Sequence, residues 1–173
     1  MSLYIVGFGG ENDNTSIRLE TKKKRFIPNS QPPERPPESL KEAIKICTSK
    51  VPGITFRRAS ATYNCVGMVF ASRRTAIEPE HLQMIIEDDG YKRIRDEKDV
   101  KIGDIVLYRD RNEYTHIGII VGIEPDIKDC RFEFTVLSQW GRDGEYVHSV
   151  EKVPEEYGND WEFWTEREEF NGG

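Results

Sequence analysis

The feature that most constrains the fold is a change in hydrophobic pattern near residue 91. Before it, capping residues and apolar spacing predict helices at about residues 40–49, 65–74 and 79–88. After it, short apolar runs separated by polar turns predict strands at about residues 102–108, 116–123, 132–138 and 146–150. Helices followed by strands favour an α+β fold, with N-terminal helices packed on an antiparallel sheet of about four to six strands.

The first 38 residues differ from the rest in composition. Residues 1–8 are apolar enough for an edge strand, whereas residues 28–38 hold five prolines. Proline-rich chain is extended and semi-rigid, so this part predicts a linker or a strap over the surface. We therefore divide the chain into an N-terminal strand and strap, residues 1–38, and a folded domain, residues 39–173. Ser39 and Glu42 have the spacing of a capping box at the start of the first helix.

Asn64-Cys65 opens the second predicted helix. Asparagine is a good N-cap, and a cysteine in the first turn lies near unpaired backbone N–H groups and the positive end of the helix dipole. A thiol in that position is expected to have a lowered pKa, and the thiolate is the reactive form. A lone cysteine near a helix start is more often a small buried hydrophobic residue. The cysteine therefore needs a partner before it indicates catalysis.

His116 supplies that partner, at the start of the second predicted strand. A cysteine on a helix start and a histidine on a strand start are the two halves of a papain-like nucleophile and base. We expect the Cys65 sulfur to lie about 3–4.5 Å from a ring nitrogen of His116. The backbone N–H of Cys65 is the expected oxyanion donor. Asn64 is expected to cap the helix, with an oxyanion contact as the alternative, and Tyr63 is a candidate residue lining the site.

The segment between Cys65 and His116 strengthens this pairing. Gly103-Asp104-Ile105-Val106 lies in a predicted strand, and a polar turn leads into His116-Ile117-Gly118-Ile119. In the order and spacing of these motifs, residues 63–157 resemble the NlpC-type and CHAP-type cysteine peptidases and amidases. The resemblance implies a papain-like fold and hydrolysis of an amide bond through an acyl-enzyme. The chemistry needs no metal and no organic cofactor.

A catalytic histidine needs a group that holds its ring. Reflecting His116 through the expected hairpin centre near residues 127–128 lands at Gln139, with one residue of uncertainty in register. The families that the chain resembles also take a polar residue from this strand. We therefore predict Gln139 as the orienting residue, with Ser138 as the second choice. His148 is expected to face solvent, with a role in the site as the alternative, and a Cys–His dyad without a third residue is also open.

Charge and cysteine content narrow the partners. The net charge of −6 argues against a general nucleic-acid binder. Three widely spaced cysteines, without a Cys-x-x-Cys motif, fit neither a disulfide framework nor a zinc site and suit a reducing compartment. No apolar run approaches the ~18–20 residues of a membrane span, and residues 1–8 lack the basic leader of a signal peptide. We expect a cytoplasmic protein with a peptide or protein substrate, and the oligomeric state stays open.

Two functions from different classes fit these features. The first is a thiol hydrolase in which Cys65 attacks a peptide or isopeptide carbonyl and His116 moves the proton. Acyl transfer and deamidation would use the same pair. The second is a catalytically idle module that binds a partner through its acidic surface and its aromatic C-terminal tail. The presence of both Cys65 and His116 favours the first function.

Overall fold

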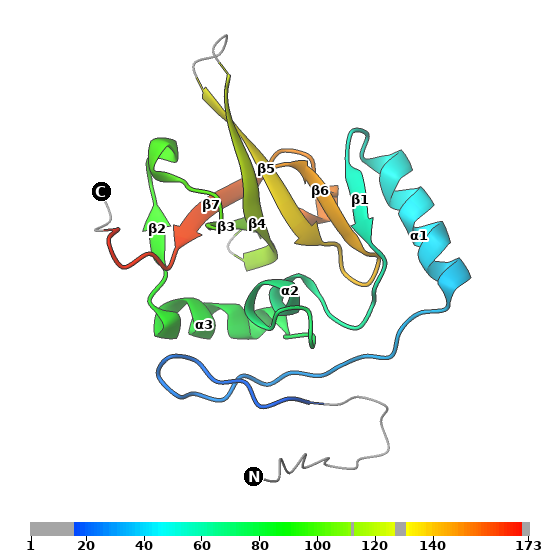
Figure 1. The fold of residues 1–173 in the computed structure, drawn as a ribbon, viewed down its shortest axis with the longest axis horizontal. Coiled ribbons are helices and arrows are strands. Elements are labelled where there is room, and N and C mark those ends of the chain that lie inside the picture. The colour runs from blue at the N-terminus through cyan, green and yellow to red at the C-terminus, as the bar shows by residue number, and fades with distance from the viewer. Residues whose placement is uncertain (1–15, 112, 127–130, 171–173) are drawn as a thin grey trace.

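The computed structural model describes residues 16–111, 113–126 and 131–170, and the expected edge strand at residues 1–8 lies outside them. Within these ranges the chain forms three α-helices, three short 3-10 helices and one open antiparallel sheet of seven strands (Figure 1). The fold is α+β, as the sequence predicts. The expected sheet of about four to six strands was too small, because β1, β2 and β7 were not foreseen.

The elements in chain order are α1 (Pro37–Lys50), β1 (Thr55–Arg58), α2 (Cys65–Phe70), η1 (Pro79–His81), α3 (Leu82–Asp89), β2 (Lys92–Ile94), η2 (Glu97–Asp99), β3 (Ile105–Asp110), β4 (Glu113–Asp126), β5 (Arg131–Gln139), β6 (Glu145–Ser149), η3 (Glu155–Tyr157) and β7 (Asp160–Thr165). The strand order in the sheet is β1-β6-β5-β4-β3-β7-β2. β4 and β5 form a long hairpin that extends beyond the neighbouring strands (Figure 1). None of the helices in the described residues has the length and hydropathy to cross a membrane.

The start of α1 differs from the prediction. The helix begins at Pro37, and Pro36 occupies the N-cap position without a side-chain hydrogen bond. The predicted capping box was therefore wrong, because the fixed φ of proline suits the first helical position and starts the helix earlier. Ser39 lies inside the helix, where its hydroxyl instead accepts a hydrogen bond of 2.7 Å from Nη2 of Arg35.

The helix that carries Cys65 is shorter than expected. α2 ends at Phe70 rather than near residue 74, because Ser72 and Arg73 take left-handed backbone conformations with φ of 50° and 67°. The chain then folds back tightly onto α2, and a Cβ atom added at Gly67 would lie 1.8 Å from the carbonyl oxygen of Thr75. Glycine is therefore required at this position. α2 is a helix of only six residues with the following loop pressed against it.

Buried side chains form two clusters on opposite faces of the sheet. Ile105, Leu107 and Ile117 pack with residues of α2 and α3, including Cys65. Their neighbours along the same strands, such as Val106 and Tyr108, belong to the other cluster. Side chains alternate between the faces of a strand, so Ile117 lies on the face covered by α2 and α3, and His116 points to the opposite face.

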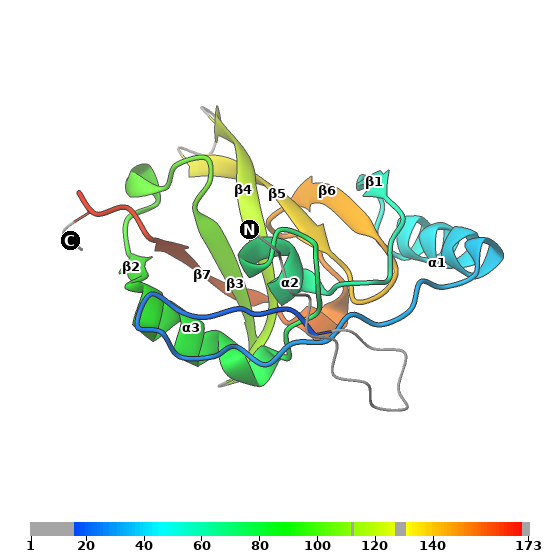
Figure 2. The same ribbon diagram turned by 60° about the horizontal axis from the view of Figure 1, so that its bottom comes forward.

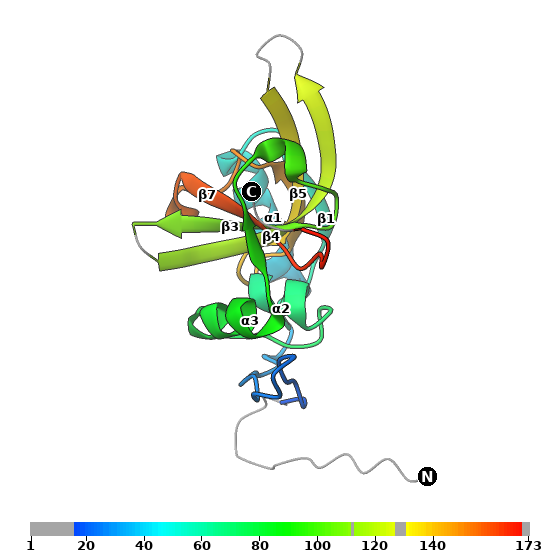
Figure 3. The same ribbon diagram turned by 90° about the vertical axis from the view of Figure 1, so that its left-hand side faces the viewer.

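Residues 16–36 form a strap across the outer side of α2 and α3 (Figures 2 and 3). Near its start, Arg25 donates two hydrogen bonds, of 2.5 and 2.6 Å, to the buried carboxylate of Asp88 in α3. Ile27 is buried in the cluster that contains Cys65. Further along, Ser30 pairs with Ala76 in an isolated β-bridge. The strap is thus packed on the helical layer, which lies between it and the sheet.

Candidate functional site

Cys65 is the first residue of α2, as predicted, and Asn64 is its N-cap. The Oδ1 atom of Asn64 accepts hydrogen bonds from the backbone N–H groups of Gly67 (2.9 Å) and Ile77 (3.2 Å). Its Nδ2 atom donates to the carbonyl oxygen of Ile77 at 2.7 Å. The capping role of Asn64 is confirmed, and its side chain also ties the helix start to Ile77. In this structure the Asn64 amide serves the backbone rather than an oxyanion position.

The thiol of Cys65 is buried and protonated at neutral pH. The residue is 8% exposed, and burial raises the pKa of the thiol to about 11. The nearby backbone groups of Ile117, Val66 and Cys65 itself act in the opposite direction but are the smaller effect. The expected lowering of this pKa was therefore wrong, because desolvation of the thiolate outweighs the backbone groups around it.

The backbone of Ile117 is the part of β4 nearest to the Cys65 thiol. Strand pairing between β4 and β5 ends at Ile119 and Leu137. Ile120 exchanges its backbone hydrogen bonds with the β3 side, at Asp104 and Gly103. By the alternation of an antiparallel strand, the Ile117 N–H faces the β5 side, where the pairing has ended. Cys65 packs in the same buried cluster as Ile117, the residue that follows His116.

His116 is buried on the other face of β4 with its ring between two tyrosines. The residue is 2% exposed, and its ring stacks on Tyr157 with centroids 3.9 Å apart and planes within 3°. The Tyr108 ring lies 5.6 Å away at a tilt of 41°. Among the described residues neither ring nitrogen has a hydrogen-bond partner. The expected hydrogen bond between Cys65 and His116 is therefore not formed.

The charge state of His116 follows from this environment. Burial, and secondly the nearby His148, lower the pKa of His116 well below its ordinary value. The imidazole is therefore neutral at neutral pH and able to accept a proton. The thiol and the imidazole are thus both neutral, and they lie on opposite faces of β4 near residues 116 and 117.

The predicted orienting residues, Gln139 and Ser138, make no hydrogen bond to His116. Ile119 pairs with Leu137 and Ile120 with Val136. Extended beyond the last pair, this register puts residue 140 opposite His116, one residue beyond the predicted Gln139. A shift of one residue moves a side chain to the other face of the sheet. Gln139 therefore points away from His116. Ser138 shares its face, since a Cβ atom added at Gly118 would lie 3.2 Å from the Ser138 Cβ.

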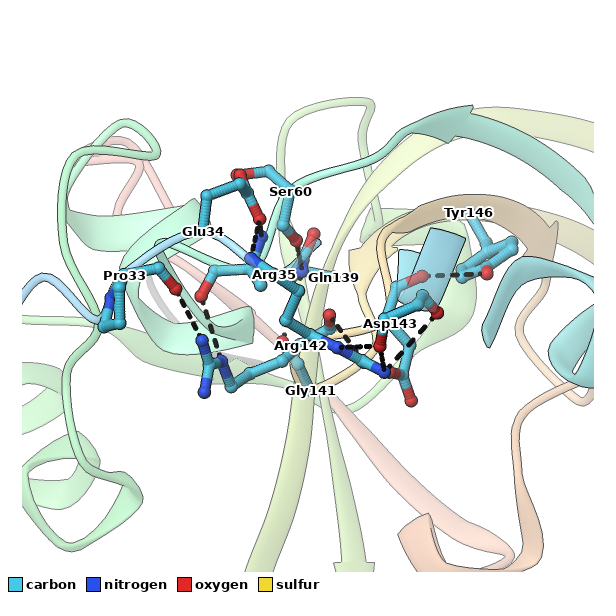
Figure 4. A network of polar contacts seen from close by, with 11 residues as sticks. Pro33, Glu34, Arg35, Ser60, Gln139, Gly141, Arg142, Asp143 and Tyr146 are labelled. Atoms are coloured by element: carbon cyan, nitrogen blue, oxygen red, sulfur yellow. Dashed lines mark hydrogen bonds and ion pairs between the residues drawn. The ribbon is translucent and has the colours of Figure 1, made fainter. Parts of the chain in front are cut away.

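Gln139 instead supports the loop that leads into Cys65 (Figure 4). Its Nε2 atom donates to the carbonyl oxygens of Ser60 (2.9 Å) and Gly141 (3.1 Å). The Ser60 hydroxyl in turn donates to the Glu34 carboxylate of the strap at 2.9 Å. The Oε1 atom of Gln139 is buried without a hydrogen-bond partner in the described structure. Gln139 thus links the strap, the loop before Cys65 and the turn after β5.

Ser138 is hydrogen-bonded to His148 rather than to His116. The Ser138 hydroxyl lies 2.8 Å from Nε2 of His148, and the Nδ1 atom of His148 lies 2.8 Å from the carbonyl oxygen of Ser149. A carbonyl only accepts, so Nδ1 carries the proton and Nε2 accepts from the hydroxyl. Trp140 donates its indole N–H to the same hydroxyl at 3.0 Å. The expected exposure of His148 was wrong: it is 2% exposed, and burial lowers its pKa to about 4.

A buried ion pair near Cys65 was not predicted from the sequence. The Tyr63 hydroxyl donates to Oε1 of Glu145 at 2.7 Å, and Nε of Arg73 donates to the same oxygen at 2.5 Å. Tyr63 and Glu145 are 1% and 3% exposed, so Tyr63 faces the interior and fixes the loop before Cys65. The only signal in the sequence was a glutamate at the start of a predicted strand, which ordinarily faces water.

Comparisons with known proteins add no relative. A scan against protein-family models, a search of curated proteins and a search of solved structures each find no match. Among the described residues, no group of three or more His, Cys, Asp or Glu side chains is placed to hold a metal ion. The arrangement of Cys65, His116 and the groups around them is therefore the basis for inferring a function.

Proposed function

We propose that this protein is a thiol hydrolase of papain-like design that cleaves an amide bond, in a peptide or an isopeptide. One observation carries the proposal: Cys65 opens α2 and packs against Ile117, the neighbour of His116 in β4. A nucleophile at a helix start and a base on the strand packed against that helix are the two parts that thiol catalysis requires. The order of α2, β3 and β4 along the chain further supports a papain-like topology.

The chemistry starts from the neutral pair. As the Cys65 sulfur attacks the substrate carbonyl, its proton passes to a ring nitrogen of His116. The backbone N–H of Cys65 stabilises the resulting oxyanion. Collapse of this intermediate breaks the C–N bond, and the imidazolium gives its proton to the leaving amine. A water molecule, deprotonated by His116, then hydrolyses the thioester and restores the thiol.

For the proposed enzyme, this structure is the resting state. The thiol is protonated, and among the described residues the imidazole nitrogens have no hydrogen-bond partner. Catalytic hydrogen bonds often form only when substrate is bound. Because His116 lies on the face of β4 opposite Cys65, the proposed reaction includes a rearrangement at the start of β4 that brings the His116 ring to the sulfur.

A second function is favoured by a specific observation. The ring nitrogens of His116 are buried and have no hydrogen-bond partner in the described part of the chain, which a site that has lost its reaction would also show. In that case the protein is an idle papain-like module, and Cys65 is a buried core residue. The two proposals differ in the reactivity of Cys65 toward an amide-like electrophile.

Labelling with a peptide that carries an electrophilic ketone tests the proposal. The protein is treated near neutral pH, and the modified cysteines are identified by mass spectrometry. We expect modification of Cys65, with a rate that falls by about 10²-fold or more in His116→Ala. Cys47, which is partly exposed and whose pKa is raised by burial, serves as the internal reference for a thiol without a histidine partner. Modification of Cys47 alone, in both proteins, would support the idle module.

A further inference from the structure

Hydrogen bonds of the Tyr157 backbone hold this residue in place over His116. The Thr115 hydroxyl, from the residue next to His116, donates to the carbonyl oxygen of Tyr157 at 2.6 Å. The η3 turn closes through a hydrogen bond of 2.9 Å from the Tyr157 N–H to the carbonyl of Pro154. These contacts fix the tyrosine relative to β4 independently of its side chain.

The residue after Tyr157 adds a steric constraint. Gly158 has a φ of 83°, and a Cβ atom there would lie 2.0 Å from the carbonyl oxygen of Arg109 in β3. Only glycine allows the η3 segment to approach the sheet this closely. The ring of Tyr157 is thereby set parallel to the imidazole at 3.9 Å.

The stacking of Tyr157 on His116 takes the place of the hydrogen bond that normally orients a catalytic histidine. Such a histidine is usually held by a hydrogen bond to one ring nitrogen. Both nitrogens of His116 are buried and lack such a bond among the described residues. The faces of the ring are instead covered, by Tyr157 in parallel contact and by Tyr108 at a tilt.

We propose that Tyr157 is the positioning residue of His116, fixing the plane of the imidazole by stacking in place of a hydrogen-bonded orienting residue. The inference deepens the proposed function and, as a statement about catalysis, rests on it. Stacking covers a face of the ring and leaves the two nitrogens at its edge uncovered by the tyrosine.

A pH titration of the His116 ring is affected by the titratable groups that face it. They are Tyr108 from β3, Tyr157 from η3 and His148 from β6, whose charge acts on His116. The Cys65 thiol lies on the other face of β4, in the cluster that contains Ile117. Both tyrosines stay neutral well above neutral pH because burial raises their pKa values. Below pH 7, only the protonation of His116 and His148 changes in this cluster.

NMR titration of the histidine rings tests the positioning role directly. The chain has three histidines, so His81→Gln and His148→Gln assign the signals. In Tyr157→Ala, water reaches the imidazole, and we expect the pKa of His116 to rise toward its ordinary value of 6.5. Tyr157→Phe keeps the ring and should keep the pKa low. Tyr91→Ala, which removes a half-buried tyrosine packed on Phe70, is the matched control and should not change it.

Labelling of Cys65 by the peptide ketone supplies the second readout. We expect a loss of about tenfold or more in Tyr157→Ala and rescue in Tyr157→Phe. An unchanged His116 titration in Tyr157→Ala, or faster labelling of Cys65 in that variant, would overturn the positioning role. If Cys65 of the unmodified protein does not react at all while Tyr157→Ala still shifts the His116 pKa, the stacking role stands and the proposed hydrolase fails.

Discussion

The Cys65 thiol lies at a helix start, yet burial raises its pKa to about 11. The position of a residue at a helix start is readable from the sequence, because Asn64 is a recognisable cap. Its degree of burial is not, because burial depends on Ile117 and on the distant segments that pack around α2. The same limit applies to His148, whose expected exposure ignored the Ser138 and Trp140 side chains that cover it.

The two buried histidines make stability depend on pH. His116 and His148 are neutral in the folded protein because burial lowers their pKa values, that of His148 to about 4. In the unfolded chain they titrate near 6.5, so below that pH the unfolded state binds protons that the native state does not. The free energy of unfolding should therefore fall as pH drops from about 6.5 to 4, by up to about 1.4 kcal/mol per pH unit for each histidine.

Urea denaturation at a series of pH values measures this slope. In His148→Gln one of the two contributions is removed, so the decline below pH 6.5 should be shallower even if the variant is less stable throughout. An identical slope in both proteins would show that His148 does not titrate on unfolding in this range.

At the scale of elements, the sequence predicted the four central strands and missed three others. β3, β4, β5 and β6 have alternating or continuous apolar residues. β1 and β2 have only four and three residues, too few for a periodic signal. β7 was hidden by Glu162, which is buried in the strand and paired with Arg109 at 2.7 Å.

Strand register was the weakest part of the site prediction. The reflection about the β4–β5 turn misses by one residue because the outer pairs, such as Asp126 with Arg131, are centred one residue later than expected and would put residue 141 opposite His116. The register shift between Ile120 and Gly122 then brings this back to residue 140. An error of one residue is enough to place Gln139 on the wrong face for a contact with His116. Gly122, a glycine inside a predicted strand, is the one sign of this shift in the hairpin sequence.

The tight return of the chain onto α2 yields a prediction at this scale. Gly67→Ala would place a methyl group 1.8 Å from the Thr75 carbonyl oxygen, so the backbone must move. We expect a loss of about 1–3 kcal/mol in unfolding free energy, together with slower labelling of Cys65, because the helix start is displaced. Gly122→Ala is the control, since its Cβ would meet only the Thr135 side chain, at 3.1 Å. An equal loss in both variants, measured by denaturation, would argue against a special constraint at Gly67.

At the scale of the whole molecule, the strap joins segments that are far apart in the sequence. Arg25 pairs with Asp88 of α3, Glu34 bonds the loop before Cys65, and Arg35 pairs with Asp143 in the turn after β5 (Figure 4). Its proline content correctly predicted extended chain. Its route could not be predicted, because it is set by ion pairs between residues more than 60 positions apart. The strap lies across the outer side of the helix that carries Cys65 and is linked through Ser60 to Gln139.

The pH dependence of Cys65 labelling by the peptide ketone tests the central claim, that Cys65 and His116 act as one unit. If His116 takes the proton during attack, the rate follows the neutral imidazole, whose pKa lies well below 6.5, and should be nearly constant between about pH 6 and 9. In His116→Ala only the thiolate reacts, so the rate should rise about tenfold per pH unit toward the thiol pKa of about 11. A tenfold rise per pH unit in the unmodified protein as well would contradict the claim, because Cys65 would then react without help from His116.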